Sequence, residues 1–125
     1  MSRIRTVLGD IFPEKLGLTL VHEHVLVDFV GAETFSKERY NAKEVFDVML
    51  PYLAEIRRLG VTGFVECTPA YMARDPQLLA SLSEAAGIHI LTNTGLYKEP
   101  YLPRSAFESS ADQLAGHWIE EVEKG

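Results

Sequence analysis

Three short apolar segments alternate with stretches of helical periodicity, and this order constrains the fold more than any other feature. The segments cover residues 18–27, 61–68 and 88–95, and each is followed by apolar residues at helical spacing. Strands joined by helical crossovers run parallel, and such crossovers are right-handed. The sequence therefore predicts an α/β fold with three βα units. Residues 3–17 should precede them as a short N-terminal strand and arm, with a turn at Gly9-Asp10.

Local signals predict where the helices begin and end. Asn41 should cap the first helix, which is expected to end at Gly60 and to kink or divide at Pro51. Asp75 is followed by proline and should start the second helix. A capping box that begins at Ser110 should open the last helix.

The length of the chain limits how far this fold can close. A closed (β/α)₈ barrel needs about 250 residues, whereas this chain has 125. We therefore interpret residues 1–125 as a single domain that forms the N-terminal portion of a longer barrel. The alternative is a complete small α/β domain. A chain that ended at Gly125 should fold poorly by itself, because the sheet would have an open edge where a fourth strand should pair.

Composition and charge exclude several classes of function. The formal net charge is −6 and the sequence has no basic run, so we expect no nucleic-acid partner. No apolar run is long enough to span a bilayer, so we expect no membrane partner. Cys67 is the only cysteine and cannot form an internal disulfide, which is typical of a reduced, cytoplasmic setting.

A His-Glu-His tripeptide lies near the end of the first predicted strand. Alternation along a strand places His22 and His24 on one side and Glu23 on the other. Neutral imidazoles are good ligands for divalent metals of the first transition row. Parallel α/β folds also carry their functional groups at the carboxyl ends of strands. The sequence predicts a metal site here, and the alternative is a pair of core histidines that neighbouring groups satisfy.

Three motifs together resemble one known family. They are the segment Gly17-Leu-Thr-Leu-Val-His-Glu-His24, the pair Arg74-Asp75 before the second helix, and Thr94-Gly95-Leu96-Tyr97 after the third strand. In this order and spacing they resemble the phosphotriesterase family of the amidohydrolase superfamily. That family includes phosphotriesterase-related proteins and phosphotriesterase-like lactonases. The resemblance extends over nearly the whole chain but corresponds to the N-terminal part of the family fold only.

The resemblance implies a (β/α)₈ TIM barrel of the metallo-dependent hydrolase type. It also implies a centre of two divalent metal ions, most often zinc, in which His22 and His24 bind the more buried ion. A hydroxide that bridges the metals would hydrolyse lactone, carboxylic ester or phosphoester bonds. The bridging carboxylate, the later histidines and the late aspartate of the family all lie beyond these 125 residues, so we expect no catalytic residue within them. The resemblance further implies a small-molecule ester or lactone as the substrate partner, and a homodimer, since family members are often dimers.

Other residues receive weaker assignments. The resemblance places Tyr97 in the substrate pocket, where tyrosine is common among lactonases, and the alternative is a loop aromatic packed on a helix. Glu66 and Cys67 are expected to serve packing or to support the metal ligands. A nucleophilic pair of Cys67 with His89 is conceivable, but a structural role is favoured for His89. His117 should lie at the surface or in an interface.

Two other functions remain open from the sequence. The first is a phosphotriesterase-related barrel without catalysis, either a binding or regulatory protein or an inactive fragment. The second is a self-contained redox or signalling domain of the flavodoxin type, although the sequence has no phosphate-binding glycine motif to support it. Residues beyond Gly125 would separate these possibilities, since a complete hydrolase needs the later metal ligands there.

Overall fold

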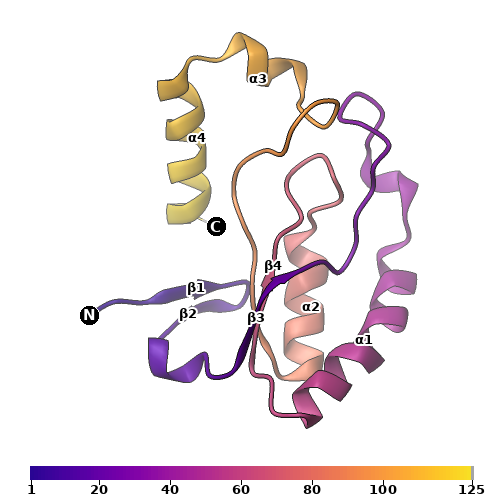
Figure 1. Cartoon of the computed structure of the whole chain (residues 1–125), viewed down its shortest axis with the longest axis vertical. Coiled ribbons are helices and arrows are strands. Elements are labelled where there is room, and N and C mark those ends of the chain that lie inside the picture. The colour runs from indigo at the N-terminus through magenta and orange to yellow at the C-terminus, as the bar shows by residue number, and fades with distance from the viewer. Residues whose placement is uncertain (125) are drawn as a thin grey trace.

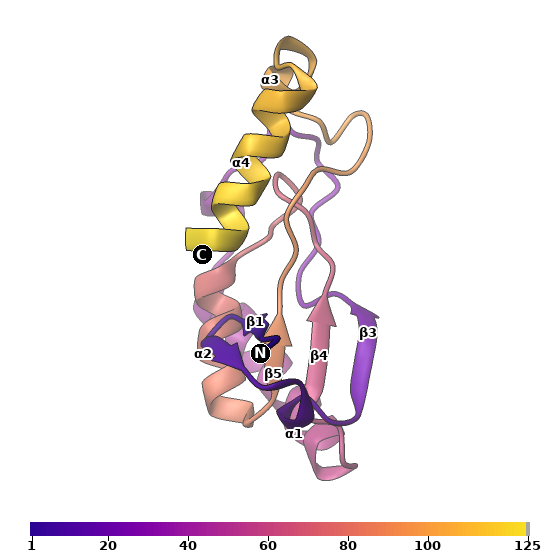
Figure 2. The same ribbon diagram turned by 90° about the vertical axis from the view of Figure 1, so that its left-hand side faces the viewer.

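A parallel three-stranded sheet forms the centre of the protein. The computed structural model describes residues 1–124, and the sheet has the strand order β3-β4-β5. In Figure 2 its three arrows point in the same direction, toward the end where α3 (Arg104–Glu108) and α4 (Ala111–Lys124) lie. The strands are shorter than the predicted segments: β3 is Thr19–Glu23, β4 is Gly63–Glu66 and β5 is His89–Leu91. The predicted parallel α/β arrangement is confirmed.

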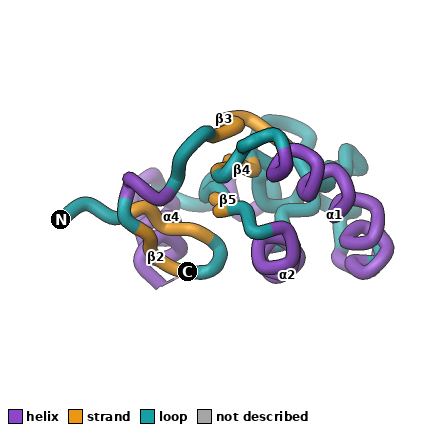
Figure 3. The backbone as a smooth tube through the Cα atoms, turned by 90° about the horizontal axis from the view of Figure 1, so that it is seen from below, coloured by secondary structure: helices purple, strands orange, loops and turns teal. Residues whose placement is uncertain are grey.

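Two helices connect the strands and cover one face of the sheet. Helix α1 (Ala42–Arg58) joins β3 to β4, and α2 (Pro76–Ala86) joins β4 to β5. Figure 1 and Figure 3 show both helices on the same side of the three strands. Their apolar faces bury the core, because removal of apolar surface from water is the main force that holds a helix on a sheet. The buried cluster consists of Val25, Leu53, Phe64, Leu78, Leu79, Leu82, Ile88 and Ile90.

The predicted caps are present, and of the two alternatives expected at Pro51, the division of α1 into two helices is wrong. The Asn41 side chain accepts hydrogen bonds from the backbone N–H groups of Lys43 and Glu44, at 3.0 and 3.2 Å. Gly87 ends α2 in the left-handed conformation, with φ of 66°. Helix α1 does not divide at Pro51, which lies exposed within a continuous helix. Proline removes one intrahelical hydrogen bond, and the buried apolar face of α1 continues on both sides of it.

The N-terminal arm is an antiparallel hairpin. Strand β1 (Ile4–Thr6) pairs with β2 (Gly9–Ile11), so Gly9 and Asp10 belong to a strand and the predicted turn there is wrong. The turn falls on the two preceding residues, where the Thr6 hydroxyl donates to the Gly9 carbonyl at 2.7 Å. The backbone N–H of Val7 donates to the Ile90 carbonyl at 2.9 Å and joins the hairpin to β5.

The last part of the chain stands away from α1 and α2, as Figure 1 shows. Helix α4 begins with the predicted capping box, since Ser110 and Gln113 exchange side-chain to backbone hydrogen bonds of 3.2 and 2.8 Å. None of its described residues is fully buried. Arg74 donates to Glu121 of α4 at 2.7 Å and fastens the helix to the loop after β4. The remaining elements are η1 (Pro13–Lys15), η2 (Lys37–Arg39), α3 (Arg104–Glu108) and α4 itself (Ala111–Lys124).

The architecture is compatible with one sector of a (β/α)₈ barrel. Strands β3 and β5 are the two edges of the sheet, and closure of a barrel would require further strands at both edges. Among residues 1–124, no helix combines the length and the apolar character that a membrane crossing requires.

Candidate metal-binding site

An irregularity in β3 brings the two histidines to an exposed position. Leu20 is opposite Phe64, but Glu23 is opposite Glu66, so β3 contains one residue more than β4 between these pairs. An extra residue of this kind changes which side of the strand the following side chains face. Leu20 packs against the core, whereas His22 and His24 are both exposed. Strict alternation from the sequence would have placed Leu20 on the histidine side.

The two imidazole rings lie next to each other. The ring centroids of His22 and His24 are 5.4 Å apart in an edge-to-face arrangement. His24 directly follows β3, at the carboxyl end of the strand, which is the end where α/β folds place functional groups. The predicted placement of the pair on a common side of the strand is therefore present in the structure.

His24 is hydrogen-bonded to a threonine that lies just after β4. Its Nδ1 lies 2.9 Å from the Thr68 hydroxyl, and that hydroxyl also contacts the Glu66 carboxylate. Glu66 and Thr68 are 2% and 0% exposed, so this contact is protected from water. The other ring nitrogen of His24, Nε2, has no such partner among residues 1–124. Sequence reasoning expected Glu66 to serve packing or to support the ligands, but it missed Thr68.

The donor set is suited to part of a metal centre. Within residues 1–124, no group of three or more His, Cys, Asp or Glu side chains is arranged to hold an ion. Two neutral imidazoles fit half of a tetrahedral zinc environment, which has four ligands. Any ion held by His22 and His24 would therefore need ligands from outside the described residues.

The loop after β3 is fastened at two points near the same end of the sheet. Arg39 donates to Asp28 at 2.6 Å, within the loop. Tyr40 donates its hydroxyl to Asp75 at 2.6 Å, and Lys37 lies 3.9 Å from the same carboxylate. Asp75 therefore has two functions: it caps α2, as the sequence predicts, and it anchors the loop that follows the histidine strand.

The charge of Asp75 makes this anchor sensitive to pH. Burial alone would raise the pKa of Asp75, but hydrogen bonds from Tyr40 and the Leu78 backbone, together with Lys37, outweigh it. The pKa of Asp75 therefore lies below its ordinary value of 3.8. Burial and the neighbouring Asp75 carboxylate raise the pKa of Tyr40, so its hydroxyl remains a donor at neutral pH.

We predict that Asp75→Asn lowers the free energy of unfolding at pH 7 by about 1 to 3 kcal/mol, because the cap is retained while the charged acceptor is lost. A carboxylate with a lowered pKa stabilises the fold above its unfolded pKa, and this contribution is lost as pH falls through the lower folded value. The deficit of Asp75→Asn should therefore shrink as pH falls below 3.8. Denaturant unfolding at neutral and acidic pH measures it, with the exposed Asp112→Asn as the control. A deficit that does not depend on pH would contradict the prediction.

The loops after β3 and β5 meet through aromatic residues. The backbone N–H of Ala32 donates to the Pro100 carbonyl at 3.1 Å. The rings of Phe29 and Tyr101 stack edge to face with centroids 5.5 Å apart, and Tyr97 lies 5.9 Å from Tyr101. Tyr97 is 52% exposed. Its neighbour is thus an aromatic residue of its own loop, and its assignment to a substrate pocket remains a prediction.

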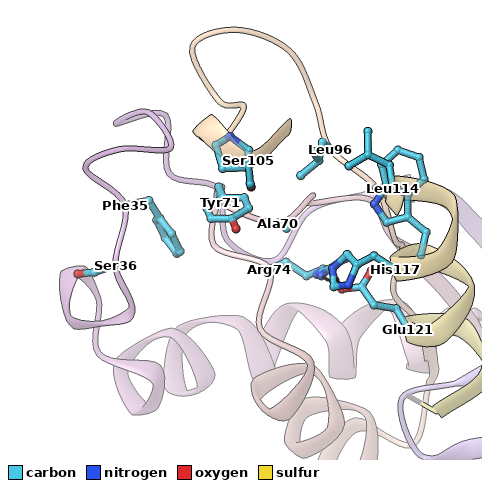
Figure 4. Close-up of a pocket in the computed structure, with 13 residues that line it drawn as sticks. Phe35, Ser36, Ala70, Tyr71, Arg74, Leu96, Ser105, Leu114, His117 and Glu121 are labelled. Atoms are coloured by element: carbon cyan, nitrogen blue, oxygen red, sulfur yellow. Dashed lines mark hydrogen bonds and ion pairs between the residues drawn. The ribbon is translucent and has the colours of Figure 1, made fainter. Parts of the chain in front are cut away.

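A separate pocket of about 350 Å³ lies between α4 and the loops after β4 and β5. Figure 4 shows Arg74, His117 and Glu121 gathered on the α4 side, with Phe35 and Tyr71 across from them. The guanidinium of Arg74 is already engaged, because it donates to Glu121 and to the Asn93 carbonyl at 2.7 and 2.8 Å. The charged side chains of this pocket, Arg74 and Glu121, therefore pair with each other. His22 and His24 do not line it.

The remaining candidates occupy structural positions. The Cys67 sulfur lies 3.9 and 3.7 Å from the carbonyl oxygens of Val21 and Val65. His89 begins β5, at the end of the sheet opposite the histidine pair, and its backbone N–H donates to Thr62. The structure thus does not bring Cys67 and His89 together as a nucleophile and base. The side chain of His117 is 66% exposed, at the surface as expected.

Taken together, these features define an α/β protein that presents a histidine pair at the carboxyl end of the first strand of its parallel sheet. The chain belongs to the phosphotriesterase family, whose family model matches residues 2–125. This family is generally dependent on a binuclear metal centre. The resemblance inferred from the three sequence motifs is confirmed.

Curated relatives include several proteins named as hydrolases. The chain is 28% identical to the aryldialkylphosphatase of Saccharolobus solfataricus, over 98% of this chain and 40% of that protein. It is 27% identical to the human N-acetyltaurine hydrolase, over 99% of this chain and 43% of that protein. It is also 27% identical to the phosphotriesterase homology protein of Escherichia coli, over 87% and 36% of the two chains. The chain thus spans less than half the length of these relatives.

Proposed function

We propose that this chain is the N-terminal part of a (β/α)₈ hydrolase that depends on two divalent metal ions. His22 and His24 bind one of these ions, and zinc is the proposed metal because imidazole nitrogen is among its preferred ligands. The observation that carries the proposal is the adjacency of the two imidazoles at the carboxyl end of β3, in a chain of the phosphotriesterase family. The residues beyond those described would supply the remaining ligands.

The residues of this chain position the metal and the substrate, and they do not themselves react with the substrate. When bound, divalent ions provide a nucleophile from water at neutral pH and polarise the bond under attack. His22 and His24 contribute neutral nitrogen donors, which add no charge to the site. The Phe29, Tyr97 and Tyr101 rings form an apolar surface on the neighbouring loops. Such a surface suits the acyl or leaving group of a substrate, since aromatic rings offer large, rigid contact areas.

The proposed substrates contain a lactone, carboxylic ester or phosphoester bond. The names of two relatives, aryldialkylphosphatase and N-acetyltaurine hydrolase, support hydrolysis as the reaction class but differ in the bond that is cleaved. An assay panel should therefore include a lactone, an aryl ester, a phosphotriester and N-acetyltaurine. Hydrolysis of one class well above the others would define the specificity.

We predict that the intact protein contains about two divalent metal ions per chain, as measured by elemental analysis after purification. Treatment with a chelator should abolish hydrolysis, and addition of zinc should restore it, because the nucleophile comes from metal-activated water. A protein without metal that hydrolyses members of the panel at full rate would contradict the proposal. A protein with both metals but no hydrolysis would instead favour a binding or regulatory role for the barrel.

A further inference from the structure

The Thr68 hydroxyl connects the metal-ligand candidate His24 to the buried Glu66 carboxylate. We propose that Thr68 is a positioning residue that keeps the proton of His24 on Nδ1 and thereby reserves Nε2 for the metal. The metal part of this inference rests on the proposed function, whereas the position of the proton is a property of the metal-free protein. Neutral imidazole carries one proton, and the hydrogen bond made by one nitrogen determines which nitrogen is left to bind an ion.

A count of hydrogen atoms leads to this assignment. The Thr68 oxygen lies 3.1 Å from the Leu26 carbonyl, contacts the Glu66 carboxylate, and lies 2.9 Å from His24 Nδ1. A hydroxyl has one proton to donate and lone pairs to accept with. Both Leu26 and Glu66 present acceptors, so the hydroxyl proton is directed to one of them. The hydroxyl oxygen therefore accepts the hydrogen bond from His24, and the donor is its Nδ1–H.

The Glu66 carboxylate acts as an acceptor and holds the hydroxyl in place. Its Oε1 accepts the backbone N–H of Val25 at 3.1 Å, and its Oε2 accepts the backbone N–H of Thr68 at 3.1 Å. These bonds join the residues that follow β3 to the end of β4, next to His24 in the sequence. Because Thr68 is fully buried, water does not compete for its hydroxyl. The support of His24 is thus built into the sheet.

His22 offers an internal comparison. Among residues 1–124 its side chain has no hydrogen-bond partner of this kind, although its ring lies beside that of His24. A histidine without a fixed partner can exchange between its two neutral tautomers. We therefore expect a single tautomer for His24 and a mixture for His22 in the metal-free protein at a pH where both are neutral.

The test is a ¹⁵N NMR measurement of histidine tautomers in the metal-free intact protein. We expect His24 to carry its proton on Nδ1 in the wild type and in Thr68→Ser, which retains the hydroxyl. Thr68→Val should let His24 populate both tautomers. Thr92→Val is the matched control, because the Thr92 hydroxyl is buried without a hydrogen-bond partner in the described part of the chain. A wild-type His24 protonated on Nε2, or a tautomer unchanged in a folded Thr68→Val protein, would overturn the proposal.

Metal affinity provides an independent readout. Loss of a partner that orients a metal-bound histidine typically weakens metal binding about 10- to 100-fold. We expect a loss in this range for Thr68→Val in competition with a chromogenic zinc chelator, and no loss for Thr68→Ser or Thr92→Val. Equal zinc affinity of wild type and Thr68→Val would overturn the role of Thr68. A wild type that binds no zinc would instead overturn the proposed function, while the tautomer of His24 would still decide whether Thr68 positions it.

Discussion

Replacement of both His22 and His24 by alanine should remove the bound metal and the hydrolytic activity together. Each substitution deletes a nitrogen donor, and the two adjacent rings are the proposed ligand pair at the carboxyl end of β3. The loss of kcat/KM should exceed about 100-fold, the upper range for loss of a residue that merely supports a ligand. Metal content by elemental analysis and turnover across the substrate panel measure the effect in the same preparation.

A matched substitution separates this loss from a general effect of removing histidine. His117 lies exposed on α4, so His117→Ala should retain both metal and activity. His22 and His24 are themselves exposed, and His24 makes one hydrogen bond to Thr68. Their replacement should therefore lower the free energy of unfolding of the metal-free protein by no more than about 1.5 kcal/mol. If the double variant were free of metal and still hydrolysed substrate at the wild-type rate, the histidine pair would have no role in the reaction.

Local chemistry explains why much of the fold could be predicted from the sequence. The caps formed by Asn41, Asp75 and Ser110 depend on residues within three positions of each other. The position of the helix end at Gly87 likewise follows from the left-handed conformation that glycine tolerates. Helical crossovers between the strands then leave a parallel sheet as the consistent arrangement.

Features that depend on pairing between distant segments could not be predicted. The additional residue in β3 appears only when Leu20 and Glu23 are matched to their partners on β4. The placement of α4 likewise involves a distant contact, because Glu121 accepts a hydrogen bond from Arg74, 47 residues away. One local feature also differs: the predicted turn of the N-terminal hairpin lies two residues too late. Gly9 has a positive φ, which is typical of turns, but it is the first residue of β2.

The candidate site likewise has one part that the sequence predicts and one part that it does not. His22 and His24 are recognisable because their spacing matches the geometry of a single strand. The contact of His24 with Thr68 spans 44 residues, and threonine at the end of a strand carries no signal in the sequence. Once β3 is paired with β4 in a parallel sheet, Glu23 lies opposite Glu66, so the partner of His24 falls within residues 66–68.

The largest effect on stability should come from Leu82→Ala. Leu82 is 0% exposed and lies in the cluster that joins α2 to the sheet and to α1. Truncation of a buried leucine loses its transfer free energy and leaves a cavity, which together cost about 2 to 5 kcal/mol. Leu59, which is 64% exposed, is the matched control, and Leu59→Ala should change stability by less than about 0.5 kcal/mol. Urea unfolding of the intact protein measures both values.

This substitution also tests whether the position of the histidine pair depends on the packing of the core. Leu82 packs on the helix-covered face of the sheet, whereas His22 and His24 are exposed at the end of β3. The folded fraction of Leu82→Ala should therefore keep the metal content of the wild type under conditions where the protein remains native. If metal content fell in proportion to stability while the protein was still folded, the position of the histidines would depend on the packing of α2. In that case the contacts among Glu66, Thr68 and His24 would be insufficient to hold the ligand when the core beneath α2 contains a cavity.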